Sequence, residues 1–90
     1  QLEKALQTIG LLIMVQPREG RNFHTAGIIL TRMQRYRMAV DSFEIESILR
    51  RAHPGTLVYW GEAMLLDGAN KVRGRELVEQ GIQAAGNDPE

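Results

Sequence analysis

The apolar residues of this chain recur at intervals of three and four positions, the spacing of one face of an α-helix. No segment shows convincing alternation of apolar and polar residues, the pattern typical of a half-buried strand. Proline, glycine and short polar runs separate the periodic stretches, as they do where helices end. We therefore expect an all-α fold of five helices joined by short links. Their apolar positions fall within residues 2–16, 23–33, 36–52, 57–65 and 77–85.

Several predicted helix ends rest on particular residues. Asn22 precedes the second periodic stretch, where its side-chain oxygen would accept a free backbone N–H as an N-cap. The third helix is expected to end just before His53 and Pro54, because the residue before a proline is pushed out of the helical region. His53 would then lie at that helix C-terminus, where a positive imidazole suits the dipole. Residues 86–90 form a polar tail that is expected to fray.

The chain also matches itself at a fixed offset. Gly27 falls on Gly61 and Phe43 on Leu77, in each case 34 positions further on. Small residues coincide with small ones and large apolar residues with large apolar ones. Such a period predicts repeated helix hairpins in which the glycines let two helices approach closely and the large residues fill the space beside them.

The residues that carry this period resemble the tetratricopeptide repeat, a helix–turn–helix unit of 34 residues. The resemblance rests on Phe23, Gly27, Leu30, Tyr36, Ala39 and Phe43 in one unit, and on Leu57, Trp60, Gly61, Met64, Gly68 and Leu77 in the next. The run of Ala5, Ile9, Leu12 and Pro17 is similar to the second half of an earlier unit. The resemblance implies one domain, residues 1–90, folded as a short right-handed solenoid of antiparallel hairpins. Its parts would be half a repeat in residues 1–20 and whole repeats in residues 21–54 and 55–90.

Some positions depart from the repeat signature. Glu46 stands where a small residue is usual, and Arg73 stands where alanine is expected. A one-residue insertion in the turn after the fourth helix would instead bring Gly74, Val78 and Gly81 to the small, aromatic and small positions. We therefore expect degenerate repeats in which the third and fifth helices are longer or shifted.

Length, cysteine content and charge narrow the function classes. The 90 residues suit one small domain, and the absence of Cys removes disulfides, thiolate metal sites and cysteine nucleophiles. The longest apolar run, residues 11–15, is far shorter than the ~20 residues of a membrane span. The net charge of zero hides an uneven distribution. Residues 18–53 hold seven Arg and four acidic residues, whereas residues 54–90 hold three basic and six acidic ones, so the molecule should be dipolar.

No catalytic residue, metal site or cofactor is expected. The two histidines, His24 and His53, lie at opposite ends of one predicted hairpin and lack the spacing of a metal motif. Glu44 and Glu46 point to different sides of their helix, so they do not form an acid/base pair. No phosphate-binding glycine loop or nucleophile motif occurs.

The resemblance also indicates a partner-binding surface. In tetratricopeptide arrays the first helix of each repeat lines a concave groove, which a peptide or an amphipathic helix occupies. Trp60 should pack between the hairpins, whereas Tyr59 can expose its hydroxyl. The apolar members of the groove would form an exposed strip, with Leu65 and Leu66 as anchors. The expected binding residues are His24, Ile28, Thr31, Arg32, Val58, Tyr59, Glu62, Leu65 and Leu66.

We expect a non-enzymatic protein–protein interaction module or scaffold, with a secretion-chaperone or assembly role as one form of it. The alternative is binding of nucleic acid or an acidic peptide by Arg32, Arg35 and Arg37, which we place second because aromatic residues for base stacking are few. A third hypothesis is self-association, since the first helix lacks a partner helix and its apolar face must be covered. The lack of Cys favours a cytoplasmic location. Because the chain begins with Gln1, we expect a fragment or a processed form that could have lost a targeting signal.

Overall fold

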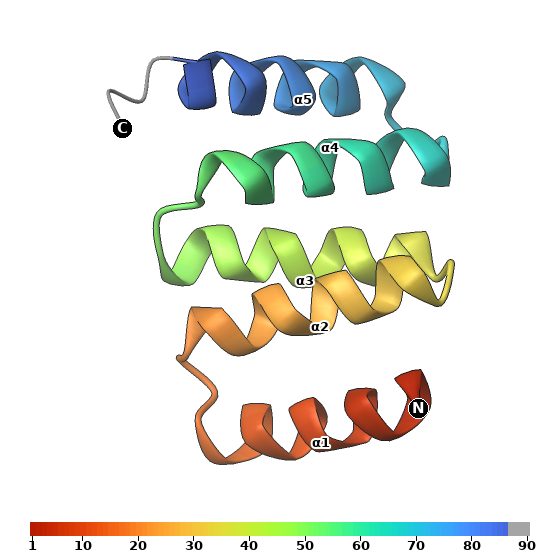
Figure 1. Ribbon diagram of the computed structural model, residues 1–90, viewed down its shortest axis with the longest axis vertical. Helices are drawn as coiled ribbons and strands as arrows, with labels where there is room; N and C mark the ends of the chain where they lie inside the picture. The colour runs from red at the N-terminus through yellow and green to blue at the C-terminus, as the bar shows by residue number, and fades with distance from the viewer. Residues whose placement is uncertain (87–90) are drawn as a thin grey trace.

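The computed structural model describes residues 1–86 and is all-helical over that range. The helices are stacked in chain order, from α1 at one end to α5 at the other (Figure 1). α2 also contacts α4, one helix further along. The predicted five helices are confirmed, and residues 87–90, with most of the predicted frayed tail, lie outside the described residues. The helices are α1 (Leu2–Val15), α2 (Gly20–Arg32), α3 (Tyr36–Leu49), α4 (Pro54–Asp67) and α5 (Lys71–Gly86).

The start of α2 differs from the prediction. Its N-cap is Glu19, whose carboxylate accepts a hydrogen bond from the backbone N–H of Arg21 at 3.4 Å. Asn22 is buried in the first turn instead, so the prediction that it caps the helix is wrong. A Cβ added to Gly20 would lie 2.9 Å from Cγ of Arg50. Glycine therefore lets the first turn of α2 pass close to the end of α3, a long-range contact that a local helix-breaker pattern does not reveal.

The link between α3 and α4 also differs from the prediction. α3 ends at Leu49, and Arg50 already has extended backbone angles (φ −157°, ψ 161°). His53 is extended as well, and Pro54 is the first residue of α4, where its missing N–H leaves no hydrogen bond unmade. His53 thus precedes α4 rather than ending α3, and its predicted role at the α3 C-terminus is wrong.

Both hairpins turn through a residue in the left-handed region. Between α2 and α3 this residue is Gln34 (φ 62°), and between α4 and α5 it is Gly68 (φ 83°). The N–H of Gln34 donates to the Thr31 carbonyl at 3.0 Å, and the N–H of Arg35 donates to the Leu30 carbonyl at 2.9 Å. These two bonds satisfy the last carbonyls of α2 in the pattern of a Schellman motif. Glycine adopts this conformation without strain, whereas glutamine does not.

The main core lies between α2, α3 and α4 and reaches α5. Phe43 and Leu77 are almost fully buried, at 0% and 1% exposure. Trp60 belongs to the same cluster, which confirms the prediction that it packs between the hairpins. The cluster consists of Leu30, Ala39, Val40, Phe43, Trp60, Ala63 and Leu77. A smaller cluster of Ile9, Ala26 and Ile29 joins α1 to α2.

Glycine brings the helices of each hairpin together. A Cβ added to Gly27 would lie 2.5 Å from Cε1 of Phe43. A Cβ added to Gly61 would lie 2.5 Å from the carbonyl oxygen of Gly74 and 2.6 Å from Cγ2 of Val78. The α4–α5 crossing therefore uses Gly74 and Val78, the shifted set that the sequence offered as an alternative.

Candidate functional site

Three of the residues predicted to line a partner groove pack against other parts of the protein. Val58 and Leu65 face α5, because a Cβ on Gly81 would lie 2.7 Å from Cγ2 of Val58 and one on Gly74 would lie 3.0 Å from Cγ of Leu65. Ile28 packs against the main core. All three side chains are partly buried, so the continuous exposed apolar strip that was predicted does not form.

The other residues of the predicted groove on α4 are exposed. Tyr59, Glu62 and Leu66 lie three to seven positions apart and so share one side of the helix, which we call the α4 face. Tyr59 is 43% exposed and Leu66 is 60% exposed. On the neighbouring α2, Arg32 is exposed in the last turn, whereas the Thr31 hydroxyl donates to the Gly27 carbonyl of its own helix at 2.8 Å. The α4 face thus combines two large apolar groups with a carboxylate.

A buried polar cluster ties α2, α3 and α4 together. The Glu46 side chain on α3 is fully buried, and its Oε1 lies 3.2 Å from Nδ1 of His24 on α2. Its Oε2 accepts hydrogen bonds from Nε and Nη2 of Arg50 at 3.0 and 2.9 Å. Thr56 of α4, also fully buried, places its hydroxyl 3.0 Å from the same His24 nitrogen. Both oxygens of the buried carboxylate are therefore held by cationic or hydrogen-bonding partners, as a buried charge requires.

The geometry of this polar cluster differs from that of a nucleophile–base–acid arrangement. In a nucleophile–base–acid arrangement the two ring nitrogens of histidine serve different partners. Here the hydroxyl of Thr56 and the carboxylate of Glu46 both meet Nδ1 of His24. If Nδ1 of His24 carries a proton that it donates to the Glu46 carboxylate, the same nitrogen cannot accept a proton from the Thr56 hydroxyl. Thr56 is also fully buried, and the cluster links α2, α3 and α4.

Sequence reasoning missed this cluster. Glu46 stood out as a large acidic residue at a position where the repeat signature has a small one, and the structure buries it completely. The one local signal was Arg50, four residues later, because Glu and Arg at this spacing meet on one helix face. His24 was predicted to contact a partner or solvent; its side chain is 30% exposed, with Nδ1 turned toward Glu46.

The arginines of the α2–α3 turn are not equivalent. Arg37 lies 4.0 Å from Asp41 and 3.9 Å from Asp67, and so bridges α3 to the end of α4. Arg32 and Arg35 are exposed, and neither forms an ion pair with another residue of the range 1–86. Among residues 1–86, the predicted basic cluster therefore has two guanidinium groups without an ion pair, beside a third that is close to two carboxylates.

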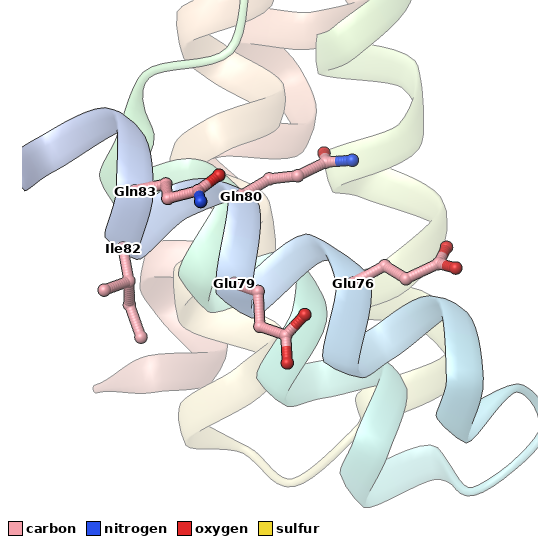
Figure 2. Close-up of a pocket in the computed structure, with 5 residues that line it drawn as sticks. All are labelled: Glu76, Glu79, Gln80, Ile82 and Gln83. Atoms are coloured by element: carbon pink, nitrogen blue, oxygen red, sulfur yellow. The ribbon is translucent and has the colours of Figure 1, made fainter. Parts of the chain in front are cut away.

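Two hollows on the surface of residues 1–86 lie away from the α4 face. One lies on α5 and is lined by Glu76, Glu79, Gln80, Ile82 and Gln83. All five side chains extend from this single helix, and Ile82 is the one apolar residue among them (Figure 2). The other lies between the α3–α4 link and the last turns of α5, beside His53, Leu57 and Ala84. Neither hollow brings together residues of the predicted binding surface.

Comparisons of the chain with protein-family models, curated proteins and solved structures found no match. Within residues 1–86 no three His, Asp or Glu side chains are placed to hold a metal ion. None of the described helices combines the length and apolar character needed to cross a bilayer. A functional proposal for this chain therefore rests on its exposed surfaces.

Proposed function

We propose that this chain is a protein–protein interaction module that binds an amphipathic helix or peptide of a partner on the α4 face. The observation that carries the proposal is the exposure of Tyr59 and Leu66 on one side of a helix whose other two sides are packed. One of those sides meets α5 through Val58 and Leu65, and another faces the main core through Trp60. Large apolar groups that remain exposed on such a helix are typical of binding surfaces.

The charges of this region define the partner that it fits. Tyr59 and Leu66 are seven residues apart, which corresponds to roughly 10 Å along α4 at the helical rise. A partner helix that presents apolar residues at the same interval would contact both. Glu62 between them favours a basic residue on the partner, and Arg32 on α2 favours an acidic one.

We also propose that the hairpins form a short solenoid of tetratricopeptide-like repeats serving as a scaffold or chaperone. Two features support this arrangement. Gly27 and Gly61, which are 34 positions apart, each lie at the close crossing of a hairpin. The helices also stack in chain order, as they do in repeat proteins. A concave binding surface would then include α2 and α4.

A peptide-display selection tests the binding proposal. Peptides enriched on the immobilised chain are expected to lose at least about tenfold in affinity on Leu66→Asp, because a buried carboxylate would replace an apolar anchor. The matched control is Ile48→Asp, which changes a similarly exposed aliphatic residue (79%) on α3. Equal losses in both variants, or no loss in either, would rule out the α4 face as the binding site.

Binding of nucleic acid or an acidic peptide by the turn arginines is the second candidate. The exposed guanidinium groups of Arg32 and Arg35 support this candidate. The carboxylates of Asp41 and Asp67 count against it, because they lie close to Arg37. Affinity for RNA or DNA that falls steeply with salt, and that Arg35→Glu removes, would favour this candidate over the α4 face.

A further inference from the structure

The hollow beside the α3–α4 link combines apolar walls with basic side chains. Its volume of about 440 Å³ lies within the size range of small-molecule sites. The α3–α4 link and the C-terminal end of α5, between which it lies, are at the same end of the molecule (Figure 1). We call this space the link hollow. Its lining residues are Arg51, Ala52, His53, Pro54, Leu57 and Ala84.

Packing on both sides of the link hollow holds its walls in place. Leu57 is partly buried and packs against the main core. A Cβ added to Gly81 would lie 2.7 Å from the Pro54 carbonyl oxygen, so α5 passes close to the start of α4 one turn before Ala84. Beyond this contact, the small side chains of Ala52 and Ala84 leave space between the link and α5. The link hollow is therefore set by the way α4 packs on α5.

The charges beside the link hollow favour an anion. The segments that form it, residues 47–61 and 80–86, contain no Asp or Glu. Arg51 is exposed, and it forms no ion pair in the part of the chain that the structure describes. His53 precedes α4 and makes no capping hydrogen bond with its side chain, and the positive end of the α4 dipole lies at the same place. An apolar space thus has uncompensated positive charge at its edge.

We propose that the link hollow binds a small organic carboxylate, with the apolar chain of the ligand inside the hollow and its carboxylate against Arg51. A guanidinium group donates two parallel N–H bonds to a carboxylate, and the chain of the ligand would contact Leu57 and Ala84. The lining comes from one link, the start of α4 and a single residue of α5, an extent that suits a small molecule rather than an extended peptide. The site is separate from the α4 face, since it includes neither Tyr59 nor Leu66.

A titration of the ¹⁵N-labelled whole chain with hexanoate, followed by NMR, tests the proposal. Hexanoate is expected to shift the amide signals of the residues that line the link hollow, with saturation. It should bind at least about tenfold more tightly than acetate, which lacks the apolar chain, or hexanamide, which lacks the charge. Shifts centred on the α4 face, no saturable shift, or equal affinities for hexanoate and hexanamide would overturn the proposal.

Two pairs of variants test the roles of charge and space separately. Arg51→Gln is expected to weaken hexanoate binding at least about fivefold, whereas Arg18→Gln, at an exposed arginine of the α1–α2 link, should change it less than about twofold. Ala84→Phe is expected to fill the link hollow and abolish binding. Ala85→Phe changes the next exposed alanine, which does not line the hollow, and should leave binding intact. Because all four side chains are exposed, native helicity by circular dichroism is expected throughout, and equal binding within either pair would overturn the proposal.

Discussion

The two hairpins bring their helices together by different means. In the α2–α3 hairpin a large aromatic ring, Phe43, lies against Gly27, and the carboxylate of Glu46 is buried nearby with its partners. In the α4–α5 hairpin the backbones themselves approach, with Gly61 against the carbonyl of Gly74. Both crossings use a glycine, but it faces a large buried side chain in the α2–α3 hairpin and the backbone of the opposite helix in the α4–α5 hairpin.

This difference determines which changes each hairpin tolerates. The α2–α3 hairpin should be sensitive to the loss of atoms, because its crossing is filled by one buried side chain. The α4–α5 hairpin should be sensitive to the gain of atoms, because its crossing has no room for a Cβ. Four sets of substitutions follow from this contrast. The first three are measured as the free energy of unfolding from urea titrations, and the fourth is measured as Tm by calorimetry.

Phe43→Ala is expected to have the largest effect. Removing a fully buried aromatic ring leaves a cavity and should destabilise the protein by about 3–5 kcal/mol. Phe43→Leu, which keeps most of the volume, should cost less than about half as much. Similar losses for both variants would mean that ring volume does not maintain the α2–α3 crossing.

Gly61→Ala is expected to destabilise by about 2–3 kcal/mol, because its Cβ would meet backbone atoms that move only if α4 and α5 separate. The control is Gly55→Ala in the same helix, where an added Cβ meets nothing within 4 Å. That change should be neutral or stabilising by up to about 1 kcal/mol, because alanine favours the helix. Equal effects at the two glycines would contradict the close approach of the helices.

Glu46→Gln is expected to destabilise by about 1–2 kcal/mol, because Arg50 loses an ionised acceptor and His24 loses a charged partner. Both partners are partly exposed, so water can replace some of what is lost. Glu44→Gln changes an exposed carboxylate on the same helix and should alter stability by less than about 0.5 kcal/mol. An unchanged stability of the Glu46 variant would indicate that the polar cluster makes no net contribution.

The hairpin turns should respond in opposite directions. Gln34→Gly is expected to stabilise the protein by up to about 1 kcal/mol, because glycine adopts the left-handed backbone conformation without the strain that glutamine has there. Gly68→Ala is expected to destabilise it by about 1 kcal/mol, because alanine would be strained in that conformation. Differential scanning calorimetry should show a higher Tm for the first variant and a lower Tm for the second. Shifts in the same direction would show that the two turns do not share this conformation.

The local features of the fold were predictable from the sequence, whereas the contacts between distant segments were not. Hydrophobic spacing gave the five helices and the burial of Trp60, because both depend on periodicity within one segment. Gly20, in the first turn of α2, passes close to Arg50, which directly follows α3. The approach of Glu46 to His24 likewise joins residues far apart in the chain. No local pattern encodes such contacts.

The predicted binding residues differ in their exposure for the same reason. Helical spacing correctly separates buried from exposed sides of α4, as Trp60 and Leu66 show. It does not determine how far the helix is rotated toward α5, and that rotation places Val58 and Leu65 against Gly81 and Gly74. Those glycines leave space into which the two side chains fit, a detail that depends on the relative placement of two helices.

The uneven attachment of the helices has a consequence for local unfolding. His24, Glu46 and Thr56 bind α2, α3 and α4 to one another, so these helices should open together, and their amide hydrogens should exchange only on global unfolding. α1 is joined mainly by the small cluster around Ile9, and can detach while the other helices stay folded. Its amides should therefore exchange sooner than those of α2, α3 and α4.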